Sequence, residues 1–289
     1  MDCCQERAGN KALRKRILDA VAHLPPMPQI AHRARAIMSN PSSSFKDLAI
    51  VLVTDQVIAS RVLKLANSAY FGLSGKVSSI QYASVVLGQK ILAELITVAA
   101  VSTVMDQALK GYGLEAGELW KHSLAVAYGS RFIAKNINSR LEDDAFSAGL
   151  IHDVGKLVLD NYIFENKQVF DRLMGNGQDT LLRAEKQTLG FDHAEIASEV
   201  CDQWNVPKKL AGAIRYHHDP AVSQGNELAY IVYLADVIAI KSQTGRETET
   251  LSYDIDDEVV RFLKFKKEDM AQILAQVSAS VQEAVQALE

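Results

Sequence analysis

The sequence predicts an all-α protein folded as a two-lobed helical bundle. Apolar residues recur at spacings of three and four along most of the chain, as in Ile17, Val21 and Leu24, and this is the period of a helix with one buried face. No segment shows the alternation of apolar and polar residues that a half-buried strand requires. A chain of 289 residues is long enough for two lobes, each with an apolar core.

The composition is that of a soluble chain that folds throughout. Hydrophobic residues make up 48% and charged residues 23%, close to the average of globular domains. The formal charge of -4 leaves no cationic excess to neutralise phosphates, so nucleic acid is not an expected partner. No apolar run is long enough to span a bilayer and the N-terminus has no signal-peptide pattern, so we expect a cytoplasmic protein without a membrane partner.

The three cysteines, Cys3, Cys4 and Cys201, form no C-x-x-C pair, and their odd number suits a reducing compartment. We interpret Cys3-Cys4 as part of an unstructured N-terminus, with a soft-metal or redox site as the alternative.

Breaks in the helical pattern divide the chain. Leu24-Pro25-Pro26-Met27-Pro28 cannot continue a helix because proline lacks the amide donor, so this segment links the first helix to the next. Gly111-Tyr112-Gly113 interrupts the pattern again and marks the boundary between the lobes. We therefore assign residues 1–15 to a flexible N-terminus and residues 16–110 to an N-terminal helical lobe. Residues 111–245 form the second lobe, and residues 246–289 form a C-terminal helical extension.

Local signals in the N-terminal lobe mark helix starts and one loop. Ser44 with Asp47 resembles a capping box, and Asp55 stands at the N-cap of a helix over 56–67. We interpret the Gly- and aromatic-rich loop 70–75 as a structural turn, with a ligand loop as the alternative.

The C-terminal extension begins with a polar segment over 243–254. The helical pattern resumes over 256–264 and in a last amphipathic helix over 267–288. This last helix either packs on the lobe or serves as a partner helix.

Residue types that bind metals gather in the second lobe. The pair His152-Asp153 follows an apolar string, and Asp236 lies in an otherwise apolar helix over 228–240. A carboxylate is costly to bury alone, whereas a cation would stabilise it. Glu118 stands four residues before His122, so the two share one face of a helix. The candidate ligands are Glu118, His122, His152, Asp153, His193, His217, His218 and Asp236.

Imidazole and carboxylate ligands together suit transition metals better than Mg or Ca, which prefer oxygen ligands alone. The residues alone therefore indicate a transition metal, Fe, Mn or Zn, and do not distinguish among the three. Taken alone, His193 could simply cap a helix, and His217-His218 could be a solvated helix end. The complete ordered set favours a metal site.

The string Ala148-Gly149-Leu150-Ile151-His152-Asp153-Val154-Gly155-Lys156-Leu157 resembles the signature helix of the HD superfamily of metal-dependent phosphohydrolases. The wider layout over residues 16–245 resembles the HDOD family, the HD-related output domains of bacterial signalling proteins. The motifs of this second resemblance are Leu24-Pro25-Pro26-Met27-Pro28, Leu63-Lys64-Leu65-Ala66-Asn67-Ser68-Ala69-Tyr70-Phe71, Ser79-Ile80-Gln81-Tyr82-Ala83 and Leu87-Gly88. Together they imply an N-terminal HDOD helical lobe followed by an HD-superfamily helical core.

The resemblance also implies roles for the ligands. Metal-binding HD proteins hold a first metal with an upstream His, the His-Asp pair and a downstream Asp, and the matching residues are His122, His152, Asp153 and Asp236. Binuclear relatives, including the HD-GYP phosphodiesterases, add ligands, and the matching residues are His193, His217, His218 and Glu118. Many HDOD proteins are described as lacking part of this set, so its completeness is a departure from the family.

Two functions follow from the resemblance. One is a regulatory HDOD protein of bacterial signal transduction, with a protein partner in a signalling pathway and an HD-type metal site. The alternative is a metal-dependent phosphohydrolase or phosphodiesterase acting on a nucleotide or another phosphoester ligand, with Asp153 and Lys156 as catalytic residues.

Lys156 either binds phosphate or is a solvated surface lysine. The Gly-Tyr-Pro element of cyclic-dinucleotide phosphodiesterases is missing after the His pair, where the chain reads Asp219-Pro220-Ala221-Val222-Ser223. We favour the regulatory protein because the HDOD resemblance spans both lobes.

Overall fold

The computed structural model describes residues 12–21, 56–67, 77–175, 180–242 and 256–264, and some positions between 272 and 286. These residues form helices joined by short turns, none of them belongs to a strand, and an isolated bridge pairs Leu109 with Leu114. The predicted all-α class is confirmed. Several expectations lie outside the described residues: those for Cys3-Cys4, the proline segment 24–28, Ser44 and Asp47, Asp55, the loop 70–75, the polar segment 243–254 and most of the helix 267–288.

The chain divides into two compact units. The larger unit comprises residues 1–24 and 107–277, and the smaller unit comprises residues 25–106 and 278–289. All the candidate ligands belong to the larger unit. Within the described residues, no helix combines the length and the apolar character needed to cross a membrane.

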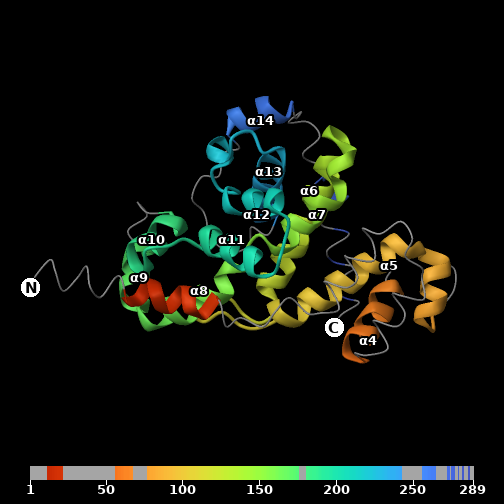
Figure 1. Ribbon diagram of the computed structural model, residues 1–289, viewed down its shortest axis with the longest axis horizontal. Coiled ribbons are helices and arrows are strands. Elements are labelled where there is room, and N and C mark those ends of the chain that lie inside the picture. Colours follow the sequence, from red (N-terminus) through yellow and green to blue (C-terminus); the bar gives the residue numbers. More distant parts are fainter. Residues whose placement is uncertain are drawn as a thin grey trace, which may run out of the picture. The chain divides into compact units, whose positions relative to one another are not determined.

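The smaller unit is built on α4 (Gln56–Ala66) packed against α5 (Ile80–Met105), as Figure 1 shows. The Ser79 side chain accepts a hydrogen bond from the amide of Tyr82 and so starts α5. Gly88 has a φ of +81° inside α5, which kinks the helix at this point. The buried face of α4 carries Ile58 and Val62 against the apolar residues of α5.

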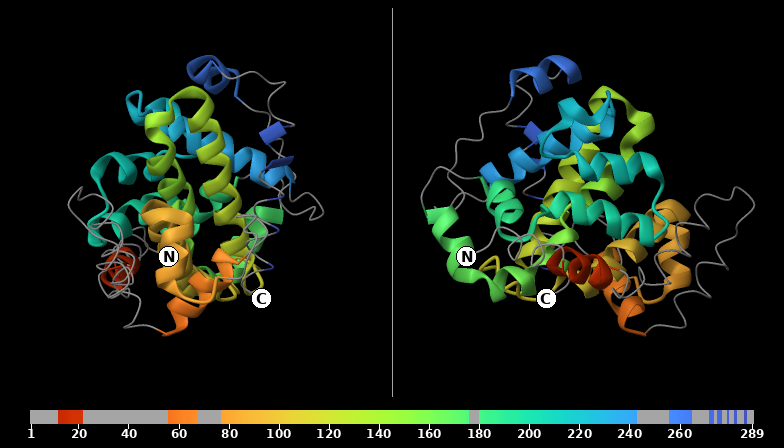
Figure 2. Two further views of the ribbon diagram at one scale, coloured as in Figure 1. Left: turned by 90° about the vertical axis from the view of Figure 1, so that its right-hand side faces the viewer. Right: turned by 60° about the vertical axis from the view of Figure 1, so that its left-hand side comes forward.

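The larger unit is a stack of helices around the candidate ligands. Its elements are α6 (Glu118–Ile137), η2 (Ser139–Leu141), α7 (Glu142–Ile151), α8 (Gly155–Glu165), α9 (Lys167–Gly175), α10 (Leu181–Leu189), α11 (His193–Gln203), α12 (Lys208–Arg215), η3 (Pro220–Ser223), α13 (Glu227–Ser242) and α14 (Asp257–Leu263). Helix α6 packs on α7 and α13, and α11 packs on α8 and α12 (Figure 2). Residues 12–21 form a further helix of this unit, with Ile17 fully buried.

Helix α13 lies in the core of this unit. Its residues are apolar on nearly all sides, and a helix of this kind is stable only when it is buried on all sides. Leu228, Ile231 and Leu234 are fully buried, and Asp236 is only 3% exposed. The core therefore contains a carboxylate that needs a partner.

Candidate metal centre

The candidate ligands come from five different segments of the larger unit. His122 lies near the start of α6, and the pair His152-Asp153 forms the turn between α7 and α8. His193 is the first residue of α11, behind the N-cap Asp192, which forms a capping box with Glu195. The other candidates are Glu118, the first residue of α6, His217 and His218, which follow α12, and Asp236 in α13.

Two glycines allow the His152-Asp153 turn to reach both neighbouring helices. A Cβ atom on Gly149 would lie 2.8 Å from the carbonyl oxygen of Val126 in α6. A Cβ atom on Gly155 would lie 2.0 Å from the carbonyl oxygen of His193 in α11. Because any larger side chain would clash with backbone at these points, the glycines of the signature string bring Asp153 close to both α6 and α11.

The first group of ligand atoms lies on the α6 and α13 side of Asp153. His122 Nε2 is 3.0 Å from Asp236 Oδ1 and 3.7 Å from Asp153 Oδ2. His152 Nε2 is 3.4 Å from Asp153 Oδ2 and 3.8 Å from Asp236 Oδ1. One ligand atom from each of His122, His152 and Asp153 lies within 4.8 Å of the others, and the same holds for His152, His217 and Asp236.

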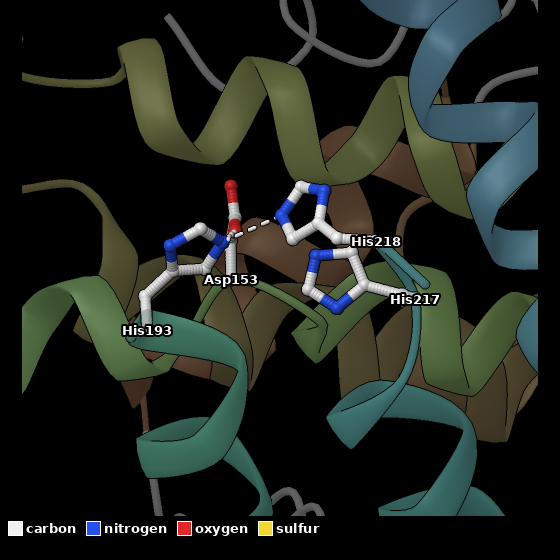
Figure 3. Close-up of side chains that lie close together, drawn as sticks. All are labelled: Asp153, His193, His217 and His218. Atoms are coloured by element: carbon white, nitrogen blue, oxygen red, sulfur yellow. Dashed lines mark hydrogen bonds and ion pairs between the residues drawn. The ribbon is translucent and has the colours of Figure 1, made fainter. Parts of the chain in front are cut away.

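The second group lies on the α11 and α12 side and is drawn in Figure 3. His193 Nε2 is 3.2 Å from Asp153 Oδ1 and 2.8 Å from His218 Nε2. The rings of His217 and His218 have centroids 3.9 Å apart. One ligand atom from each of Asp153, His193, His217 and His218 lies within 4.8 Å of the others, which is the spacing of donors around one ion.

The buried polar atoms of the cluster fit a metal ion. His152 Nε2, His217 Nε2, Asp153 Oδ1 and Asp236 Oδ1 are buried and form no hydrogen bond. Asp236 Oδ1 is close to His122, and Asp153 Oδ1 is close to His193, yet neither pair has hydrogen-bond geometry. Atoms that approach one another without bonding are typical of ligands directed at a shared cation, which would remove the cost of burying them.

The histidine tautomers agree with this interpretation. Nδ1 of His152 lies 2.8 Å from the carbonyl oxygen of Gly149, and Nδ1 of His217 lies 2.6 Å from that of Ile214. A carbonyl can only accept, so each Nδ1 carries the proton. Each Nε2 therefore presents its lone pair to the cluster, as a metal ligand must.

The cluster shifts the pKa of its carboxylates downward. Burial alone would raise the pKa of Asp153, but His152, Lys156 and His193 together hold it well below the usual value. Burial likewise opposes ionisation of Asp236, and the adjacent His122 nevertheless lowers its pKa far below that of an ordinary aspartate. Both carboxylates are therefore ionised at neutral pH, which suits them to bind a cation.

The histidines divide into two classes. Burial lowers the pKa of three of them, His152, His217 and His218. The pKa of His217 falls to about 3, and that of His218 falls well below its usual value. Burial also opposes charge on His193, but the carboxylates of Glu185 and Asp153 raise its pKa to about 10. The pKa of His122 is raised because Asp236 outweighs burial. The neutral rings are ready to bind a metal, and His193 must first release a proton.

Glu118 and Lys156 are not among the residues whose ligand atoms gather in the cluster. Glu118 Oε2 accepts a hydrogen bond from the amide of Glu115 at 2.8 Å, and Glu118 belongs to none of the ligand groups found among the described residues. Its role as a ligand stays a prediction. Lys156 Nζ donates to Asp153 Oδ2 at 2.8 Å, and the residue is 9% exposed, so it is a buried partner of the cluster.

Glu185 is a residue of the site that was not predicted from the sequence: it is fully buried in α10 and hydrogen-bonded to His193. One sequence signal could have identified it. Glu185 lies beside Ala184 and four residues before Leu189, so it belongs to the buried face of an amphipathic helix. A carboxylate at such a position needs a buried donor.

Comparisons with known proteins place the chain in a family. The family model of the HDOD domain matches residues 24–220. An HDOD domain protein of unknown function from Geobacter sulfurreducens has a similar structure, with a TM-score of 0.78, 25% identity, and coverage of 96% of each chain. A protein provisionally named a phosphohydrolase, from Shewanella amazonensis SB2B, has a TM-score of 0.76 and 25% identity over 94% of this chain and 98% of that chain.

One relative found by sequence is a much longer protein. An uncharacterized protein of Treponema pallidum is 24% identical over 210 residues, which is 70% of this chain and 39% of that protein. The chain thus spans well under half the length of this curated relative. The helical fold, the His-Asp turn and the match over residues 24–220 agree with one another, and the chain belongs to the HDOD family.

Proposed function

We propose that this chain is a regulatory protein of bacterial signal transduction whose HD-type centre binds one or two transition-metal ions. The observation that carries the metal proposal is the set of four buried polar atoms without a hydrogen bond, on His152, Asp153, His217 and Asp236. Burying a polar atom without a hydrogen bond costs about 1–3 kcal/mol, which makes an empty centre costly. A bound cation removes that cost.

The donor set supports Fe or Mn, with Zn as the alternative. Five imidazoles and two carboxylates meet in the cluster: His122, His152, His193, His217 and His218 with Asp153 and Asp236. Mixed nitrogen and oxygen ligands without thiolate favour these metals over soft-metal or all-oxygen chemistry. We propose these seven residues as the ligands.

The position of Asp153 supports two ions. Its Oδ1 faces His193 at 3.2 Å, whereas its Oδ2 faces His152 at 3.4 Å and His122 at 3.7 Å. One carboxylate therefore lies between the two groups of ligand atoms. A bridging carboxylate is the arrangement that would let two close cations share a negative charge.

Family membership supports the regulatory role. The HDOD match covers residues 24–220 and so extends into both units, whereas hydrolysis would need only the cluster in the larger unit. We extend the proposal to a protein partner in a signalling pathway and to a cytoplasmic location. Fold alone does not determine function, so the experiment has to address the centre directly.

Metal analysis of the purified full chain tests the proposal. We expect one or two equivalents of Fe or Mn in the wild type and strong loss in Asp153→Asn, with anomalous scattering locating the ions at Asp153. The control is Asp202→Asn, because Asp202 is an exposed aspartate paired with Lys208 on the surface. Metal content at background level in wild type after loading with Fe²⁺, Mn²⁺ or Zn²⁺ would refute the metal centre.

A second candidate function is metal-dependent phosphoester hydrolysis. It is favoured by Lys156, whose ammonium group lies 2.8 Å from Asp153 Oδ2, and by the 15% exposure of the His122 and His218 side chains, through which the cluster reaches solvent. The similar protein from Shewanella amazonensis bears a phosphohydrolase name. A bound metal would supply an activated water, and Lys156 would stabilise phosphate charge.

Turnover distinguishes the two functions. The metal-loaded chain is assayed with phosphomonoesters, nucleotides and cyclic dinucleotides, beside the double variant His152→Ala, Asp153→Ala. Hydrolysis by wild type alone supports the enzyme. Equal background rates in both, with metal bound in wild type, leave the regulatory role as the function of the centre.

A further inference from the structure

Glu185 is a buried carboxylate with three donors. The amide of His193 donates to Glu185 Oε2 at 2.9 Å, and His193 Nδ1 lies 2.9 Å from Oε1 and 2.8 Å from Oε2. The hydroxyl of Tyr112 donates to Oε1 at 2.7 Å. Both the backbone and the ring of His193 are therefore held by one side chain of α10.

This carboxylate determines which nitrogen of His193 faces the cluster. An ionised carboxylate only accepts, so Nδ1 carries the proton and Nε2 points toward Asp153 Oδ1 and His218 Nε2. His152 and His217 instead donate to neutral backbone carbonyls. A hydrogen bond to a charged acceptor is stronger, and it makes the opposite ring nitrogen more basic.

The turn that carries Tyr112 is itself anchored. The amides of Gly111 and Tyr112 donate to Asp160 Oδ1 at 2.7 and 3.4 Å. A Cβ atom on Gly111 would lie 2.3 Å from the carbonyl oxygen of Asp160, so this turn lies directly on α8. Glu185 is thus oriented by a fixed hydroxyl on one side and by the start of α11 on the other.

We propose that Glu185 is a positioning residue that orients His193 and strengthens it as a ligand of the metal position bounded by Asp153, His193, His217 and His218. The proposal rests on the metal binding proposed above and adds the residue that determines the affinity of this position. Removing the charge of the Glu185 carboxylate leaves His193 in place but makes its Nε2 a weaker metal ligand. Outer residues of this kind change metal affinity about 10- to 100-fold.

The test compares Glu185→Gln with Glu195→Gln in the full chain, using Co²⁺ alone as the probe. Glutamine has the shape of glutamate, and its amide can accept from His193 and donate to the oxygen of Tyr112, so we expect the fold to be retained. Glu195 is the matched control because it lies two residues from His193 and its Oε2 accepts from the amide of Asp192 rather than from a ring.

Two readouts are measured: Co²⁺ affinity by competition with a chelator, and the visible ligand-field spectrum of bound Co²⁺. We expect Glu185→Gln to weaken affinity about 10- to 100-fold and to shift the spectrum, and Glu195→Gln to leave both unchanged. A purely structural role would lower thermal stability without moving the spectrum. Unchanged affinity and spectrum in Glu185→Gln, or equal losses in both variants, overturn the positioning role.

The outcomes separate this inference from the proposed function. Wild type that binds no Co²⁺ overturns both, whereas wild type that binds Co²⁺ with Glu185→Gln unchanged overturns only the inference. If Glu185→Gln does not fold, the ¹⁵N-histidine NMR spectrum of Zn²⁺-loaded wild type decides. We expect His193 to carry a strongly deshielded proton on Nδ1, and a His193 without a proton on Nδ1 overturns the proposal.

Discussion

The Nε2 atom of His122 lies 3.0 Å from Oδ1 of Asp236, so a residue near the start of α6 contacts a carboxylate in the middle of α13. Helix α13 is apolar on nearly all sides and packs against α6, so this polar contact lies at the interface of the two helices. This contact closes the cluster on the side away from α11. The carboxylate of Asp236 therefore provides a direct test of the metal centre.

Asp236→Asn keeps the shape of the side chain but removes the charge that a cation would neutralise. We expect metal affinity to fall by at least about 10- to 100-fold, since outer residues already have effects of that size. Metal content after dialysis against a chelator measures the loss. Asp171→Asn is the control, because Asp171 is an exposed partner of Lys167. Equal metal retention in Asp236→Asn and wild type would contradict the assignment.

Gly155→Ala tests the close approach of α8 to α11. The new methyl group would lie 2.0 Å from the carbonyl oxygen of His193, so the helices must separate. We expect a loss of about 1–3 kcal/mol in the free energy of unfolding, the usual cost of overpacking, together with weaker metal binding. Urea unfolding followed by circular dichroism measures the first effect.

Gly212→Ala provides the matched control for that substitution. Gly212 lies in α12, where a Cβ atom would meet only Asn226 Nδ2 at an ordinary 3.6 Å. Alanine stabilises a helix more than glycine does, so we expect the free energy of unfolding to increase by about 0.5–1 kcal/mol. A loss of stability in both variants would show that the clash at Gly155 is not the cause.

The metal-free protein should lose stability as the pH falls below about 6.5. His217 has a folded-state pKa of about 3, because burial and the neighbouring histidines disfavour its charge. Between these two values the unfolded chain binds a proton that the folded chain does not, so stability decreases toward acid. One such group contributes a slope of up to about 1.4 kcal/mol per pH unit.

His217→Gln checks this origin of the slope. The variant lacks the group that must protonate on unfolding, so its stability should depend less steeply on pH across the same window. Urea titrations of both proteins at several pH values, with a chelator present, give the two slopes. Parallel slopes for the variant and the wild type would rule out His217 as a source.

Metal affinity should increase with pH around neutrality. Burial disfavours the charged form of His193, but the carboxylates of Glu185 and Asp153 raise its pKa to about 10, so the ring is protonated at pH 7. Its second proton lies on Nε2, because Nδ1 donates to Glu185. A metal must displace this proton, which adds about a tenfold rise in affinity per pH unit for each proton released.

Competition titrations with Co²⁺ at two pH values, in wild type and His193→Gln, measure this dependence. The variant should bind more weakly, and its affinity should rise less with pH because one displaced proton is missing. A pH dependence that is identical in the two proteins would show that the released protons come from other groups.

Local patterns determined the helices and the types of ligand. Helical spacing predicted 56–67, 228–240 and 256–264, and the structure has α4, α13 and α14 at these places because periodicity depends only on near neighbours in the chain. The motifs distributed over residues 16–245 likewise indicated the HDOD family, and the HDOD match over residues 24–220 confirms it.

The tertiary structure decided which of these residues meet. Seven of the eight candidate ligands come together, while Glu118 instead bonds to the amide of Glu115 at the start of α6. It also placed Glu185 against His193, a contact between α10 and the start of α11 that depends on how those helices pack. The physical reason is that a sequence determines the chemistry of each side chain and its face on a helix. Distances between helices follow only from close packing of the whole core, including the glycines that let two backbones touch.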